Sequence, residues 1–349
     1  MRKAIILSIV LLFTNSCIDP LDLEIENQAE QLVVDGMITN EPGPYTVRLS
    51  RSKPYNTYTD SWNAVEARAT VVIVDDRGNQ ETLTETEPGV YQTSQAGIQG
   101  EVGHTYTLSI RTRNGQEYTS APETLQPVPP MDSLYFEVRA QQILNEVEVE
   151  ETMYVVDVLV DVPDPLQERN YYKWQWQGTF QVNTQPWNYA EKVRGVWVPM
   201  PKDCCEVCWV TSPGNRVNVQ NDRLINGRIL SRHVVTSIPV TEQAFGTKYH
   251  LEVKQMSVSE AAYDYWRLLK AQIEIGESIQ DPPPATIIGN ITSTNDPDVK
   301  ALGFFGAAAV TSKVVVIGRE DLGVRVGEYV FPDDCRVISR STTERPAFW

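Results

Sequence analysis

The chain has few residues that could act as bases or nucleophiles near neutral pH. Its 349 residues include only three histidines, His104, His233 and His250. None lies at metal-ligand or triad spacing from a partner, and neither a His-Glu-x-x-His nor a Gly-x-Ser-x-Gly motif occurs. The sequence therefore contains no zinc-protease or hydrolase motif. We expect no catalytic residue and no enzyme, although a facing pair of carboxylates, as in glycosidases, has no sequence signature and stays open.

Positive charge is scarce as well. The chain has 30 Lys and Arg against 46 Asp and Glu, which gives a formal net charge of -16 at pH 7. Proteins that bind nucleic acid use clustered Lys and Arg on the phosphate backbone, so nucleic acid is not an expected partner. A hydrophobic content of 41% is typical of a globular chain, and the length is enough for two domains.

No apolar run in the chain reaches the length of a membrane-spanning helix. Residues 4–13 are mainly apolar and follow two basic residues, but the run is shorter than the roughly 20 residues of a membrane-spanning helix. We therefore interpret residues 1–16 as a signal peptide and Cys17 as a lipid-attachment site. The alternative is an ordinary thiol just after a general cleavage site. Residues 17–30 are acidic and extended, as expected of a tether.

Alternation of apolar and polar residues predicts strands from residue 31 onwards. It is clearest at Tyr45, Val47 and Leu49 and at Tyr106, Leu108 and Ile110. Asn114-Gly115 follows the second set and favours a β-hairpin with a type I′ turn. The spacing of the strands predicts an immunoglobulin-like β-sandwich over residues 31–126, and a proline-rich linker follows at 127–133.

Residues 134–349 predict a second β-rich domain that carries one α-helix at about 257–276. Long alternating runs at 154–162 and 172–182 indicate strands. For the helix, Ser257 and Glu260 form a capping box by spacing. Its expected buried stripe consists of Ala262, Trp266, Leu269 and Ile273. We expect this helix to pack on the sheet of the second domain, and the fold class to be mainly β.

Several short motifs in a fixed order cover essentially the whole chain after residue 16. They are Cys17-Ile18-Asp19-Pro20, Leu32-Val33-Val34-Asp35-Gly36, the stretch from Val258 to Trp266, Pro282-Pro283-Pro284, Gly289-Asn290-Ile291, Leu302-Gly303-Phe304-Phe305-Gly306-Ala307 and Pro346-Ala347-Phe348-Trp349. This set resembles the domain of unknown function 4249 family of Bacteroidota outer-membrane lipoproteins. The resemblance implies a lipid-anchored outer-membrane protein associated with TonB-dependent β-barrel receptors, and it supplies no catalytic residues. Exposure on the cell surface is a further expectation from the family and the acidic tether.

Four cysteines remain once Cys17 is assigned to lipidation. They are Cys204, Cys205, Cys208 and Cys335. In an exported protein two disulfides are expected, with three possible pairings. Because adjacent cysteines rarely bridge each other, we expect one local bridge to Cys208 and one long-range bridge from Cys335. A structural zinc site and a redox-active pair at Cys205 and Cys208 are the alternatives. We expect no metal and no cofactor.

Aromatic residues divide into two groups. Trp174 and Trp176 share the apolar face of an alternating strand and are expected in the core. Trp187, Tyr189 and Trp197 lie in a less regular stretch and are candidates for an exposed contact surface. The leading hypothesis is an accessory subunit that docks on a TonB-dependent outer-membrane receptor or transporter. A glycan-binding surface lipoprotein and a hydrolase with an unrecognised carboxylate pair are the alternatives.

Overall fold

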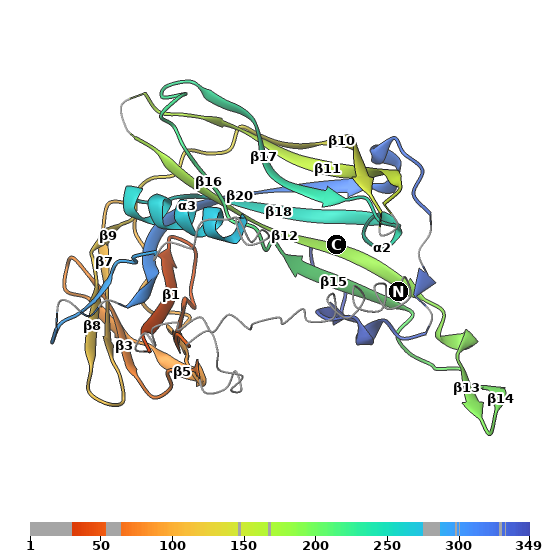
Figure 1. Cartoon of the computed structure of the whole chain (residues 1–349), viewed down its shortest axis with the longest axis horizontal. Coiled ribbons are helices and arrows are strands. Elements are labelled where there is room, and N and C mark those ends of the chain that lie inside the picture. Colours follow the sequence, from red (N-terminus) through yellow and green to blue (C-terminus); the bar gives the residue numbers. More distant parts are fainter. Residues whose placement is uncertain are drawn as a thin grey trace, which may run out of the picture.

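The described residues form four sheets: three of them pack face to face in two halves of the molecule, and the fourth is a two-stranded hairpin at residues 190–199 (Figure 1). The computed structural model describes residues 30–53, 64–145, 148–166, 169–274, 287–296, 299, 301–327, 330–331 and 333–349. An 11-stranded sheet runs through both halves, covered by a six-stranded sheet in the first half and a three-stranded sheet in the second. The mainly β fold class expected from the sequence is confirmed.

In the first half, β1, β2, β6 and β5 of the large sheet face the six-stranded sheet β19-β8-β7-β3-β4, with β9 paired to β7. The bounds of the strands before residue 126 are β1 (Leu32–Thr39), β2 (Thr46–Arg51), β3 (Thr70–Asp75), β4 (Gln80–Thr82), β5 (Thr84–Glu87), β6 (Val90–Gln92), β7 (Thr105–Arg111), β8 (Glu117–Ser120) and β9 (Glu123–Thr124). The alternating residues named above, Tyr45 to Leu49 and Tyr106 to Ile110, are buried in the core between these sheets.

In the second half, β22-β15-β12-β18-β20 of the large sheet face the three-stranded sheet β10-β11-β17. The long strands are β10 (Ser133–Leu144), β11 (Glu150–Pro163), β12 (Tyr171–Thr184), β17 (Ile229–Pro239), β18 (Lys248–Ser257) and β20 (Leu302–Gly318). The short strands are β13 (Ala190–Val193), β14 (Val196–Pro199), β15 (Val207–Pro213), β16 (Asn218–Asn221), β19 (Ile291–Ser293), β21 (Val330–Phe331) and β22 (Ser341–Thr342). The helices are η2 (Pro186–Asn188), α2 (Glu242–Phe245), α3 (Glu260–Glu274), η3 (Arg319–Leu322) and η4 (Cys335–Val337).

Strand β20 joins the two halves. Its first residues pair in parallel with β1, from Val33 opposite Leu302 to Thr39 opposite Ala308, and its later residues pair antiparallel with β18. Strand β19, which also follows the predicted linker in sequence, pairs with β8. The C-terminal part of the chain thus completes the core of the first half, where Phe305 is fully buried.

Three details differ from the sequence predictions. The hairpin at Asn114-Gly115 forms, but Asn114 lacks the positive φ of a type I′ turn, and only Gly115 (φ +83°) has it. The α3 cap is Ser259, whose hydroxyl accepts a hydrogen bond from Ala262 N at 3.1 Å, because Ser257 still belongs to β18. Of the predicted stripe only Ala262 is buried, whereas Trp266 and Leu269 are half-buried and Ile273 is 63% exposed.

The helix content also differs slightly, since the described residues include a second, four-residue helix, α2. The signal peptide, Cys17 and the tether up to residue 29 lie outside the described residues. None of the described helices is both long enough and apolar enough to cross a membrane.

Candidate functional site

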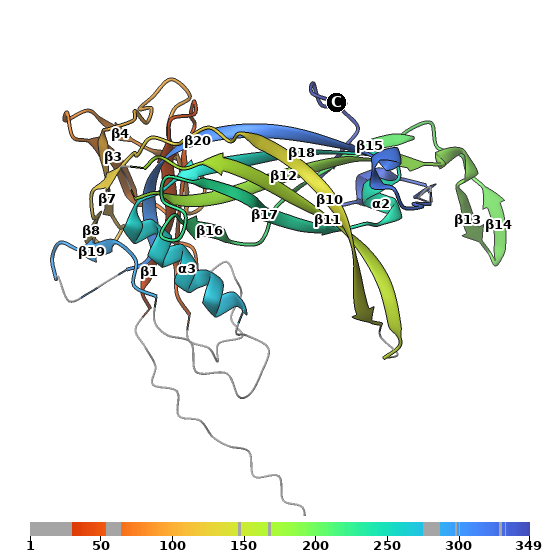
Figure 2. The same cartoon turned by 90° about the horizontal axis from the view of Figure 1, so that it is seen from above.

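The β13–β14 hairpin projects from the end of the second half, away from both packed layers (Figures 1 and 2). Val193 pairs with Val196, and the two residues between them, Arg194 and Gly195, both have positive φ. That geometry is the type I′ turn of a tight hairpin. The solvent-exposed apolar side chains of the hairpin and its base are Trp187, Val193, Val196, Trp197, Val198 and Met200.

The base of the hairpin is held to the body by polar contacts around Lys202. Its ammonium lies 3.8 Å from the centre of the Tyr189 ring and 2.9 Å from the Asp333 carboxylate. The backbone adds two hydrogen bonds, from Met200 N to Tyr189 O at 2.8 Å and from Lys202 N to Pro186 O at 3.0 Å. Tyr189 is therefore part of the support, whereas Trp187 and Trp197 are 52% and 67% exposed. Of the three predicted contact residues, the two tryptophans are free to meet a partner.

The four cysteines lie next to this base and form two disulfides. Cys208 bridges Cys335, and Cys204 bridges its neighbour Cys205. The predicted long-range bridge from Cys335 is present, but its partner is Cys208, so the predicted local bridge to Cys208 is wrong. The local bridge joins the adjacent Cys204 and Cys205 instead, which the prediction had excluded. Cys205 has a φ of +69°, and this backbone conformation accompanies the bridge to Cys204. Sulfur atoms of Cys204 and Cys205 also lie within 4.8 Å of an Asp334 oxygen, but in the disulfide they are not thiolate ligands.

A second feature is a cavity of about 450 Å³ at an interruption in the large sheet. Strand β15 leaves β12 after Pro213 opposite Gln177, and β16 joins β12 only at Asn218 opposite Trp174. The loop between β15 and β16 arches over the gap, tied down by a 2.8 Å hydrogen bond from Gly214 N to Trp176 O. The cavity lies below this loop.

Lys173 and Trp266 meet at one wall of the cavity. The Lys173 ammonium lies 3.4 Å from the centre of the Trp266 ring, and the lysine is only 5% exposed. Burial lowers the pKa of Lys173 to about 8, although the charge of Asp35 opposes this change. Helix α3, which carries Trp266, covers this part of β12 and β16. The predicted core position is confirmed for Trp174, which is fully buried, whereas Trp176 is half-buried at the edge of the same core.

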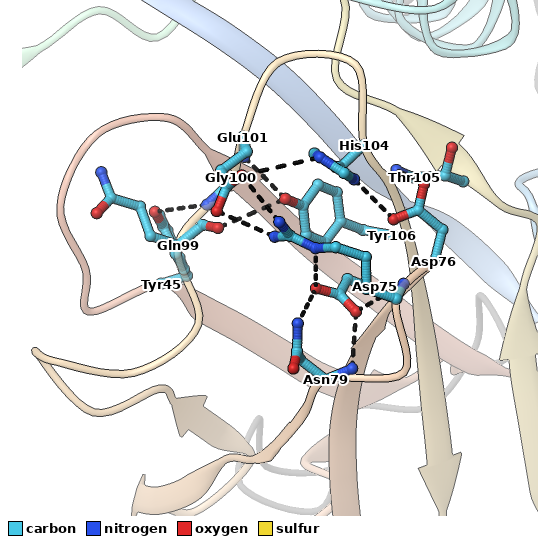
Figure 3. Close-up of polar contacts among 11 residues, drawn as sticks. Tyr45, Asp75, Asp76, Asn79, Gln99, Gly100, Glu101, His104, Thr105 and Tyr106 are labelled. Carbon is cyan, nitrogen blue, oxygen red and sulfur yellow. Dashed lines mark hydrogen bonds and ion pairs between the residues drawn. The ribbon is translucent and has the colours of Figure 1, made fainter.

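A third feature is the polar network between the β3–β4 turn and the loop before β7 (Figure 3). Arg77 pairs with Glu101 at 3.0 Å, and His104 Nδ1 lies 2.9 Å from Asp76 Oδ1. Burial would raise the pKa of Asp75, but hydrogen bonds from Asn79 and Arg77 outweigh it and hold that pKa below its ordinary value. The hydrogen bond from Arg77 lowers the pKa of Glu101 as well.

This network fixes a turn, and its three carboxylates are not proton donors near neutral pH. A general acid needs a raised pKa, and the carboxylates of Asp75, Asp76 and Glu101 all have lowered ones. The hydrolase with a carboxylate pair stays a prediction.

Sequence reasoning missed the Lys173–Trp266 pair. Lys173 falls on the polar face of β12 by alternation, and its burial depends on α3, which is about 90 residues further along the chain. The sequence does predict that the 257–276 helix packs on this sheet, and that packing is what buries Lys173.

These features define a mainly β, disulfide-bonded protein with a projecting apolar hairpin and a separate aromatic cavity. Residues 18–314 match the model of the family described as Domain of unknown function (DUF4249), and the chain belongs to that family. The family membership inferred from the ordered motifs is thereby confirmed over residues 18–314. No curated protein matches the chain.

Proposed function

We propose that the protein is an outer-membrane lipoprotein that docks on a TonB-dependent receptor or transporter through the β13–β14 hairpin and helps it to take or retain a ligand. The lipid anchor is Cys17, and the hairpin is the contact surface. The observation that carries the proposal is the exposure of Val196 and Trp197, at 65% and 67%, on an element that packs against neither layer.

Exposed apolar surface of this kind supports a contact role. Exposing aromatic and aliphatic side chains to water has no stabilising effect on the chain itself, and such patches commonly mark protein interfaces. The tip also carries Lys192 and Arg194, so it is locally basic on a chain of net charge -16. A partner with a mixed apolar and acidic surface would complement it.

The placement of the hairpin is consistent with a partner at the membrane. In Figure 2 the β13–β14 hairpin and the far end of the β10–β11 hairpin extend toward the side on which β1 begins. A lipid anchor that precedes β1 would hold this side of the molecule toward the bilayer. A receptor embedded in that bilayer would then be within reach of the hairpin.

The test is affinity purification in mild detergent from the native envelope, followed by mass spectrometry. The protein carries a C-terminal tag and is compared with the double variant Val196→Ser/Trp197→Ser. Leu224→Ser is the matched control, because Leu224 is 91% exposed but lies outside the hairpin. Cys17→Ala tests the anchor.

We expect the wild type and Leu224→Ser to recover a TonB-dependent barrel, and the double variant to recover at least tenfold less. Cys17→Ala should release the protein from the membrane and lose the barrel. Recovery of no barrel with the wild type would contradict the docking role. Equal recovery with the double variant would contradict the assignment to the hairpin.

Glycan binding by Trp187 and Trp197 is the second candidate, because both indoles are exposed on the same projecting element. A glycan array probed with the wild type and with Trp197→Ala tests it, with the circular dichroism spectrum as the check on folding.

A further inference from the structure

We propose that the cavity between β15 and β16 is a binding site for a carboxylate-bearing sugar, with Lys173 and Arg216 as the partners of the carboxylate and Trp176 and Trp266 as the stacking surfaces. This site lies apart from the β13–β14 hairpin, and it does not depend on the docking role proposed above.

The first reason is that two hydrogen-bond donors at the cavity lack acceptors. Lys173 is buried, yet its ammonium donates no hydrogen bond to any of the described residues and rests against the Trp266 ring. Trp266 Nε1 is buried as well and has no hydrogen-bond partner in the described part of the chain. Leaving a buried charged donor without an acceptor is costly, typically by about 1–3 kcal/mol or more. An anionic ligand in the cavity would supply acceptor oxygens to the Lys173 ammonium.

The second reason is the sign of the charge around the cavity. Lys173, Arg216 and Lys254 line it, against one carboxylate, that of Glu252. Lys254 is already paired with Glu41 at 2.8 Å, whereas Arg216 is exposed and makes no ion pair with a described residue. The Asp35 carboxylate acts on Lys173 from nearby, so Arg216 is the lining cation that is left for an anion, with Lys173 beside it. An arginine fork can bind a carboxylate with two parallel hydrogen bonds.

The third reason is the shape of the remaining lining. The indoles of Trp176 and Trp266 provide flat apolar walls, which match the C–H faces of a sugar ring. Gln175, Gln177 and Asn215 are exposed amides at the same site and can both donate to and accept from hydroxyl groups. A volume of about 450 Å³ lies within the range of roughly 300–1,000 Å³ typical of small-ligand sites.

Gly214 maintains the position of one wall. A Cβ atom on residue 214 would lie 2.5 Å from Trp176 Nε1, so any larger residue would displace the indole. The loop and the tryptophan therefore fit only while residue 214 is glycine.

The test is titration of the full chain, followed by tryptophan fluorescence and calorimetry. The probes are glucuronic acid and N-acetylneuraminic acid, with glucose as the neutral sugar and acetate as the carboxylate without a sugar ring. We expect saturable binding of at least one acidic sugar, and at least tenfold weaker binding of glucose and of acetate. Lys173→Met should weaken acidic-sugar binding at least tenfold, and Arg216→Gln at least threefold.

Lys248→Met is the matched control, since that lysine lies over Trp349, 4.5 Å from the ring centre, outside the cavity. It should bind like the wild type. Arg216→Gln is an independent test, because Arg216 is exposed and its replacement alters no buried residue. Equal binding of glucose or acetate, unchanged affinity in Arg216→Gln, or failure of both acidic sugars to bind would overturn the proposal.

Discussion

The carboxylate of Glu123 accepts a hydrogen bond of 2.7 Å from the hydroxyl of Ser259, the residue that caps α3. The other carboxylate oxygen lies 3.5 Å from Asn290 Nδ2, and that asparagine is in turn bonded to the backbone of Phe305 in both directions. Glu123 thus connects β9 of the first half, α3 of the second half and the strand that joins them. The residue is 3% exposed, and burial raises its pKa to about 7.

The raised pKa of Glu123 predicts a pH-dependent stability. Between about pH 4.5 and 7 the folded state retains a proton that the unfolded state has lost, so the free energy of unfolding falls as the pH rises. The loss amounts to at most about 3 kcal/mol. Glu123→Gln should remove this part of the pH dependence. Urea unfolding at pH 4.5 and pH 8 measures it, with the exposed Glu87→Gln as control.

The same reasoning gives the opposite sign for Lys173. Its pKa is about 8 in the folded state and 10.5 in the unfolded chain, so the unfolded state binds more protons between these two values. The buried ammonium of Lys173 therefore lowers the free energy of unfolding below pH 8, and this effect disappears as the pH rises toward 10.5. We expect Lys173→Met to be about 1–2 kcal/mol more stable than the wild type at pH 7, after the lost contact with Trp266 is counted.

That advantage of Lys173→Met should shrink as the pH approaches 10.5. Lys248→Met provides the comparison, because it also removes a lysine over a tryptophan ring but at a half-buried position. A Lys173→Met variant less stable than the wild type at every pH would contradict this account of the buried ammonium.

The sequence predicts the features that depend on local pattern, but not those that depend on the pairing of distant strands. Alternation located the core faces of β2, β7, β11 and β12, because successive side chains of a strand point to opposite faces. The parallel pairing of β1 with β20 joins residues some 270 positions apart, and no local pattern encodes it. The α3 cap moved from Ser257 to Ser259 because Ser257 pairs with Ala309 in the sheet.

The two candidate sites show the same contrast between local pattern and distant pairing. Trp187 and Trp197 lie in a stretch without regular alternation, which predicts that they are exposed, and both are. The cavity depends on where two strands leave and join β12, which is a property of sheet register.

A glycine on β20 tests the junction between the halves. Gly303 has a φ of +91°, and a Cβ atom there would lie 1.9 Å from Val34 O. Gly303→Ala should therefore destabilise the protein by about 2 kcal/mol or more, through backbone strain and the clash with β1. Gly306→Ala on the same strand is the control, since its nearest neighbour would be Met37 at 3.4 Å. Chemical denaturation of both variants measures the difference, and equal stability of the two would contradict the expected clash.

The two disulfides should differ sharply in their contribution to stability. Cys208–Cys335 joins residues 127 positions apart, whereas Cys204–Cys205 joins neighbours. Constraint of the unfolded chain grows with the length of the closed loop and reaches about 5 kcal/mol for a loop of this size. Cys208→Ala/Cys335→Ala should thus lower the free energy of unfolding by several kcal/mol, and Cys204→Ala/Cys205→Ala by much less.

Because β22 pairs with β15 directly beside Cys208, Cys208→Ala/Cys335→Ala should also expose residues 333–349 to proteolysis. Urea unfolding without reductant, with limited proteolysis alongside, checks both effects. Equal destabilisation by the two double variants would show that loop length is not the source of the stability.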